Sequence, residues 1–108
     1  MSSYVLSGDA DADLQDIFSF GIVTWGEKRA TKYIYDMYEK LDLVGFNADI
    51  GRARPELHPF VRALPHGSHL LFFMPWRGGT LVVRILHGAA DHQRAFEGYD
   101  PLASVTAD

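Results

Sequence analysis

The sequence predicts an α+β fold, in which an antiparallel helix hairpin packs on a three- to four-stranded antiparallel sheet. Apolar residues recur every three or four positions between residues 14 and 44, and three β-type runs with turn residues between them follow at 60–87. The 108 residues, 47% of them hydrophobic, are typical of one globular domain. We therefore expect residues 1–108 to form a single domain, with a loosely structured tail at 97–108.

The first elements are a short β-type run at residues 4–6 and a helix that follows it. Ser7 is a suitable N-cap, and three aspartates occupy the next two turns, where the helix dipole favours negative charge. Gly26 ends this apolar pattern, and a second set of apolar residues at helical spacing runs without interruption from Ala30 to Val44. A single glycine between two helices predicts an antiparallel hairpin.

Glycines and prolines break any helix between residues 45 and 59, so we interpret that segment as an ordered connection. Short turns join the β-type runs beyond it, which predicts an antiparallel meander that the run at residues 4–6 can join. The expected strands are 60–64, 69–74 and 80–87, and one helical turn is expected at 92–96.

Both faces of this sheet are apolar, although one helix hairpin covers only one of them. At about 25 cal/mol per Å², an open apolar face would cost several kcal/mol in water. Either the tail folds back over that face or, as we prefer, a partner chain covers it. The side chains that we assign to this partner contact are Arg62, Leu71, Phe73, Val82 and Leu86.

The chain has a net charge of −4, and its charged residues are distributed unevenly along the sequence. Residues 51–94 contain six arginines, no lysine and only two carboxylates, whereas the helical region is acidic. An acidic chain with one basic block argues against direct nucleic-acid binding, which needs a broad positive field. The chain has no cysteine and its first residues resemble neither a signal peptide nor a membrane span, so we expect a cytoplasmic protein.

Groups that could carry out chemistry are few. His66 with His69, and His87 with His92, are the nearest histidine pairs, but neither has the spacing of a metal site, and only Asp91 could add a carboxylate. The sequence contains no phosphate-binding loop, dinucleotide fingerprint or nucleophile elbow. We therefore expect no metal and no cofactor, and we interpret His87 as either a general acid or base or a strand-end histidine.

Five motifs occur in an order that resembles the ParE toxins of the RelE/ParE superfamily. They are YVLS at 4–7, the Trp25-Gly26 junction, GRARPEL at 51–57, GSH at 67–69 and RILH at 84–87 followed by Asp91. The resemblance covers residues 4–96 and implies a β-α-α-β-β-β toxin of a type II toxin–antitoxin system. It also implies a hetero-oligomer with a ParD-like, DNA-binding antitoxin on the apolar face, and roles in plasmid maintenance and the stress response.

The resemblance further implies that the target is DNA gyrase, inhibited by binding rather than by an enzymatic reaction. The target-contact residues are then expected at the end of the last strand and beyond it: Arg84, His87, Asp91, Arg94, Phe96 and Tyr99. The alternative is mRNA cleavage on the ribosome, as in the RelE branch, with Arg84 and His87 as catalytic residues. That alternative fits less well, because the basic block has no lysine and the last strand no tyrosine.

Overall fold

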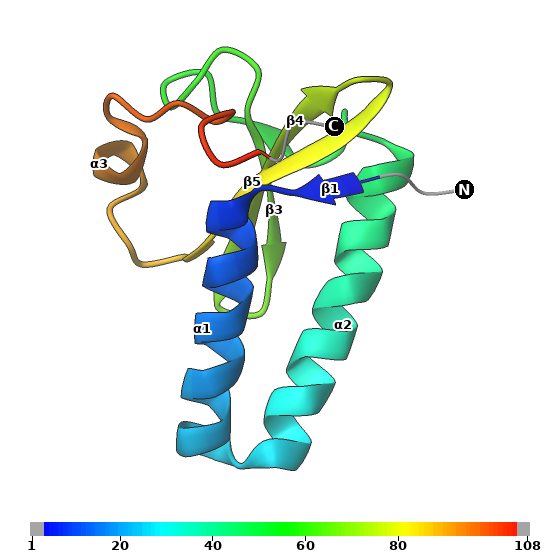
Figure 1. Cartoon of the computed structure of the whole chain (residues 1–108), viewed down its shortest axis with the longest axis vertical. Helices are drawn as coiled ribbons and strands as arrows, with labels where there is room; N and C mark the ends of the chain where they lie inside the picture. Colours follow the sequence, from blue (N-terminus) through cyan, green and yellow to red (C-terminus); the bar gives the residue numbers. More distant parts are fainter. Residues whose placement is uncertain (1–3, 106–108) are drawn as a thin grey trace.

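The computed structural model describes residues 4–105, and it places two long helices beside a five-stranded sheet (Figure 1). The α+β class predicted from the sequence is confirmed. No helix among residues 4–105 is both long and apolar enough to cross a bilayer. The elements in chain order are β1 (Tyr4–Leu6), α1 (Gly8–Trp25), α2 (Glu27–Phe46), β2 (Arg52–Ala53), β3 (Arg62–His66), β4 (His69–Trp76), β5 (Gly79–His87) and α3 (His92–Phe96).

The sheet has the strand order β1-β5-β4-β3-β2. It differs from the prediction in two ways, because β1 pairs with β5 in parallel and β2 adds a fifth strand. The segment at 45–59 was interpreted as a connection only, yet Arg52 pairs with Ala63 and Ala53 with Arg62. Gly51 makes this entry into the sheet feasible: it has a φ of 77°, and a Cβ there would collide with the carbonyl oxygen of Ala63.

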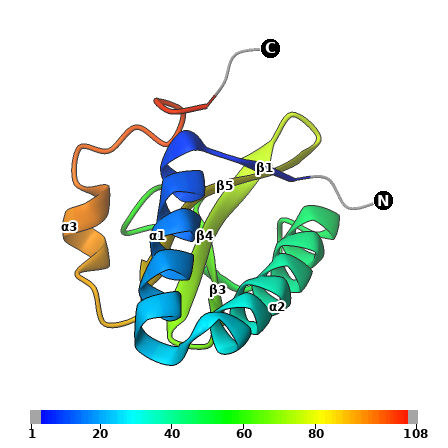
Figure 2. The same ribbon diagram turned by 60° about the horizontal axis from the view of Figure 1, so that its bottom comes forward.

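The helix hairpin forms as predicted and covers one face of the sheet (Figure 2). The Ser7 hydroxyl accepts the Ala10 N–H at 2.9 Å, which confirms the N-cap, and Gly26 joins the helices with a φ of 92°. Where the helices meet, a Cβ at Gly21 would lie 3.1 Å from that of Ala30, so the glycine permits their close approach. The core beneath them, on the helix-covered face, includes Leu14, Met37, Leu41, Leu71, Phe73, Val82 and Ile85.

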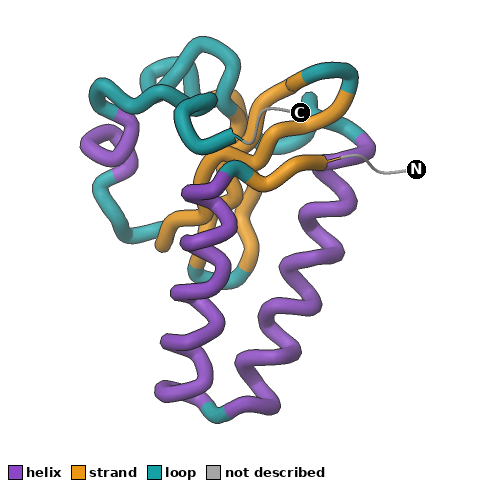
Figure 3. Tube along the Cα trace, viewed as in Figure 1, coloured by secondary structure: helices purple, strands orange, loops and turns teal. Residues whose placement is uncertain are grey.

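The opposite face of the sheet is covered by the chain itself. Its buried residues Phe72, Leu81 and Val83 form a second core with Phe96 of α3, and Tyr99 and Val105 pack against that core. The segment after α3 is drawn as loop in Figure 3, and we call residues 97–105 the tail and this side the tail-covered face. We preferred a partner chain as the cover of this face, and that prediction is corrected, because the tail folds back over it.

Candidate functional site

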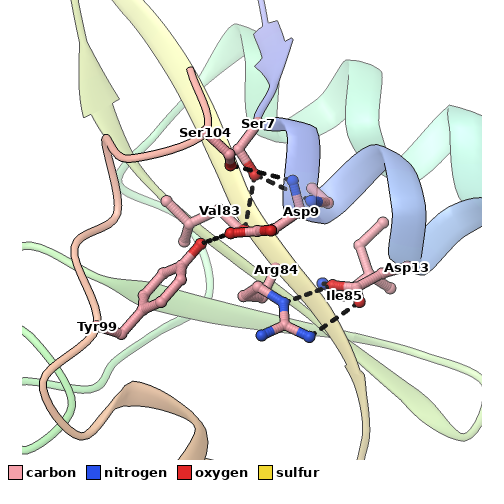
Figure 4. Close-up of polar contacts among 9 residues, drawn as sticks. Ser7, Asp9, Asp13, Val83, Arg84, Ile85, Tyr99 and Ser104 are labelled. Carbon is pink, nitrogen blue, oxygen red and sulfur yellow. Dashed lines mark hydrogen bonds and ion pairs between the residues drawn. The ribbon is translucent and has the colours of Figure 1, made fainter.

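Beyond the residues that pair with β1, backbone groups on the edge of β5 form hydrogen bonds with side chains of Ser7 and of α1. β1 pairs only with residues 80–82 of β5, so the backbone groups that follow need other partners. The Ser7 hydroxyl donates to the carbonyl of Val83 at 2.8 Å, and the Asp13 carboxylate accepts the N–H of Ile85 at 2.9 Å (Figure 4). The start of α1 thus continues the hydrogen-bonding ladder that β1 leaves unfinished.

Asp13 also binds Arg84, the residue that the sequence placed in both functional alternatives. Nε and Nη2 of Arg84 donate to the two carboxylate oxygens of Asp13 at 2.7 and 2.9 Å, a bidentate geometry (Figure 4). The hydrogen bonds that Arg84 donates to Asp13 raise the pKa of Arg84, and both side chains are mostly buried. Arg84 is therefore held as part of the fold. No sequence signal indicated the pair, because its members are 71 positions apart.

The tail is fastened to the first turn of α1. The Tyr99 hydroxyl donates to the Asp9 carboxylate at 2.7 Å, and burial together with this acceptor raises the pKa of Tyr99. Ser104 accepts two N–H groups of the same turn: its carbonyl binds Gly8 at 2.9 Å and its hydroxyl binds Asp9 at 3.0 Å. The expectation of a loosely structured tail is thus corrected for residues 97–105, whereas 106–108 lie outside the described residues.

The six predicted target-contact residues divide into two groups. Arg84 and Tyr99 donate hydrogen bonds to aspartates of α1, and Phe96 is buried in the tail-covered core, with 5% of its surface exposed. The other three are exposed and lie together at the end of β5 and the start of α3: His87, Asp91 and Arg94.

Local bonds hold these three residues in place. Asp91 caps α3 by accepting the N–H of Arg94 at 3.0 Å, and the His92 ring contacts the His87 carbonyl at 2.9 Å. Asp91 and Arg94 also line a cavity of about 600 Å³ with Glu56. The chain therefore presents one polar surface at this end of the sheet, which we call the β5–α3 surface (His87, Asp91, Arg94).

Most of the predicted antitoxin contacts lie inside the protein. Leu71, Phe73 and Val82 have no exposed surface and lie beneath the helices, so no partner can touch them in this conformation. Leu86 packs at the tail-covered core, and Arg62 donates to two backbone carbonyls of the connection at 2.9 Å each. The expectation that all five contact an antitoxin is corrected for the three buried ones.

A groove between the two long helices offers an apolar surface that sequence reasoning did not single out. Its cavity measures about 290 Å³, and Tyr35 on its wall is 65% exposed. Apolar residues of the groove and of the core follow the same helical periodicity, so the sequence pattern does not distinguish groove residues from core residues. We call it the helix groove, and it is lined by Asp11, Leu14, Gln15, Phe18, Thr31, Ile34, Tyr35 and Tyr38.

Tyr33 of α2 organises the histidines at the β3–β4 turn. Its hydroxyl lies 2.7 Å from Nδ1 of His69, donates to the His66 carbonyl at 3.0 Å and accepts the Ser68 N–H at 3.2 Å. The His69 and His87 rings are 5.4 Å apart, and burial, with His87 and His66 nearby, lowers the pKa of His69. Within residues 4–105, no three His, Asp or Glu side chains are arranged to hold a metal ion.

Comparison with known proteins gives this architecture a family. Residues 4–92 match the family described as "ParE toxin of type II toxin-antitoxin system, parDE". The chain therefore belongs to the ParE toxin family of type II toxin–antitoxin systems, and the resemblance seen in its motifs is confirmed.

Relatives and a solved structure agree with this membership. Toxin ParE1 of Mycobacterium tuberculosis is 38% identical over 94 residues, which cover 86% of this chain and 96% of the relative. Toxin ParE of Escherichia coli is 29% identical, with 84% and 89% covered. A chain of the chromosomal ParDE toxin–antitoxin system from P. aeruginosa superposes with a TM-score of 0.69 at 27% identity, covering 81% of this chain and 96% of its own length.

Proposed function

We propose that this ParE toxin acts in the cytoplasm by binding and inhibiting DNA gyrase, and that a cognate ParD-like antitoxin neutralises it. The pairing of Arg84 with Asp13 carries the choice of target. Metal-free phosphodiester cleavage needs a cation placed to stabilise charge on the phosphorane. Arg84 was the cation in the mRNA-cleavage alternative, and its charge is already used by Asp13, so the structure supports binding rather than chemistry.

The β5–α3 surface is our proposed gyrase contact. Its three side chains are exposed and charged or polar, and they lie on a strand end and a capped helical turn rather than on a long loop. Such placement limits the entropy lost when a partner binds. We assign Arg84, Phe96 and Tyr99 a structural role instead, because all three are held within the fold.

A supercoiling assay with purified gyrase tests the target. The parent chain should block supercoiling and accumulate cleaved DNA. Arg94→Ala should weaken inhibition roughly fivefold or more, because a central charged contact is typically worth at least 1 kcal/mol. Arg77→Ala, which removes an exposed arginine from the β4–β5 turn at the opposite end of β5 from His87, is the matched control and should inhibit like the parent. A parent chain that leaves gyrase active, or that cuts mRNA in a translation mix, overturns the proposal.

The helix groove is our proposed antitoxin site. It combines a buried floor at Leu14 with exposed aromatic walls, and an amphipathic segment with anchors every three or four residues fits such a groove. The P. aeruginosa relative was solved as a ParDE toxin–antitoxin system, which supports a partner of this kind. Aromatic residues such as Tyr35 are the usual energetic centres of protein interfaces.

Matched charge substitutions on α2 test the groove. Tyr35→Glu should weaken antitoxin binding by about 2 kcal/mol, roughly thirtyfold, measured by titration calorimetry. Phe46→Glu is the control, since Phe46 is 67% exposed on the same helix but does not line the groove. Equal affinities for the two variants would contradict the assignment.

A further inference from the structure

A third cavity lies between the C-terminal half of α1 and the end of the sheet. It measures about 250 Å³, less than the roughly 300–1,000 Å³ of pockets that enclose drug-sized ligands, so its size suits a single side chain. We call it the α1–sheet pocket, and it is lined by Asp16, Ile17, Phe20, Trp25, Ser68, His69 and His87.

One side of α1 leads to this pocket. Asp9, Asp13, Ile17 and Phe20 recur every three or four residues and so share that side of the helix. Its first two acids are occupied, Asp9 by Tyr99 and Asp13 by the Arg84 guanidinium (Figure 4). Asp16 is the next acid along α1, and its carboxylate makes no hydrogen bond or ion pair with any residue between 4 and 105.

The remaining walls suit a flat cation. Phe20 and Trp25 stand edge to face with ring centres 6.4 Å apart, and aromatic faces attract guanidinium groups. Trp25 already has the Arg29 guanidinium 5.8 Å from its ring centre, so Phe20, which is 65% exposed, offers the larger aromatic surface to an incoming guanidinium. Burial keeps His69 neutral at pH 7, so its imidazole adds no opposing charge there.

We propose that the α1–sheet pocket binds the guanidinium of an arginine side chain supplied by a protein partner. The carboxylate of Asp16 forms the ion pair, and Phe20 and Trp25 enclose the planar group. Arginine suits this arrangement better than lysine, because its planar fork binds a carboxylate and stacks on rings at the same time. The acid without a partner beside two aromatic rings is the observation that carries the inference.

The position of the pocket identifies which partner supplies the arginine. At 100° per residue, Asp16 and Phe20 lie on the side of α1 opposite Leu14 and Phe18, which line the helix groove. His87 belongs to both the pocket and the β5–α3 surface. The arginine is therefore expected from the target rather than the antitoxin, and in this respect the inference rests on the proposed function.

Nuclear magnetic resonance on the full ¹⁵N-labelled chain tests the pocket directly. The probe is a blocked Gly-Gly-Arg-Gly-Gly peptide, and its citrulline analogue has the same shape without the charge. The arginine peptide should shift the indole N–H signal of Trp25 in a saturable way, while Trp76, which lies outside the pocket, serves as the internal control. Asp16→Asn should weaken binding about tenfold, as expected when a charge-assisted hydrogen bond is lost.

Two further variants make the result specific. Phe20→Ala, at a side chain that is 65% exposed, should also weaken binding without unfolding the chain. Glu39→Gln removes the same charge from an exposed position on α2 and should leave peptide affinity unchanged. Equal shifts with the citrulline peptide, an unchanged affinity in Asp16→Asn, or tighter binding of free agmatine than of the peptide would overturn the proposal.

The gyrase assay separates the two proposals. A parent chain that inhibits gyrase but does not bind the arginine peptide refutes the pocket and leaves the proposed function standing. A parent chain that binds the peptide but leaves gyrase active refutes the target and keeps the pocket as an arginine site. If both hold, Asp16→Asn should inhibit gyrase less strongly than Glu39→Gln.

Discussion

Phe72 and Phe73 are neighbours in β4, both fully buried, yet they belong to different halves of the molecule. Phe73 packs under two long helices, whereas Phe72 packs under a five-residue helix and the tail. The helix-covered face is closed by many periodic apolar contacts. The tail-covered face is closed by a few side chains that polar bonds at Tyr99 and Ser104 hold in place. Equal burial can therefore result from covers of very different construction.

Truncating these two phenylalanines gives the largest expected effect. Phe72→Ala and Phe73→Ala should each lower the free energy of unfolding by about 3–5 kcal/mol, measured in urea, because each leaves a cavity in a closed core. Similar losses would show that the tail encloses its core as fully as the helices do. If Phe72→Ala costs less than half as much as Phe73→Ala, the tail does not seal its face in solution.

The Asp13–Arg84 pair joins the two covers around the edge of β5. Arg84 lies opposite Phe72 in the register, on the tail-covered face, while Asp13 belongs to α1. Asp13→Ala should cost about 2 kcal/mol, because it leaves a mostly buried guanidinium and the Ile85 N–H without their partner.

A double-mutant cycle checks this interpretation. Arg84→Met removes the charge but keeps much of the side-chain length, and adding it to Asp13→Ala should recover part of the lost stability. Purely additive losses would mean that the ion pair contributes little, and that the backbone hydrogen bond to Asp13 accounts for the cost.

The helix-covered face could be predicted from the sequence almost completely, because its signals are local. The pattern from Ala30 to Val44, the Ser7 cap and the Gly26 junction each depend on residues within one or two helical turns. The β3–β5 meander was predicted for the same reason, since short turns fix the strand pairing, although β3 lies two residues beyond the expected 60–64. The helical turn at 92–96 was also predicted from local residues.

The tail-covered face and most of the site could not be predicted in this way. Tyr99 bonds to Asp9 across 90 positions, and Arg84 bonds to Asp13 across 71, so neither pair leaves a spacing signal. The apolar strands correctly indicated that something covers the second face, but apolarity does not distinguish a partner from the tail. The alternation also does not say which of two apolar faces the helices cover, and the wrong choice placed Leu71, Phe73 and Val82 in a partner contact when they belong to the helix-covered core.

The smallest expected effect concerns the single hydroxyl that fastens the tail. Tyr99→Phe should lower the free energy of unfolding by about 1–2 kcal/mol at pH 7, because it leaves the Asp9 carboxylate without this donor. Tyr35→Phe, at an exposed tyrosine of α2, is the control and should change stability little.

The raised pKa of Tyr99 adds a pH dependence with a definite sign. Below its ordinary pKa of 10.0, the phenol is protonated in both the folded and the unfolded chain, and the bond to Asp9 contributes in full. Above pH 10 the unfolded chain releases this proton while the folded chain retains it, so the parent loses stability that Tyr99→Phe does not. Urea titrations at pH 8 and pH 10.5 should show the difference between parent and variant shrinking, and a constant difference would mean that Tyr99 is not held by Asp9 and the tail is fastened chiefly through Ser104.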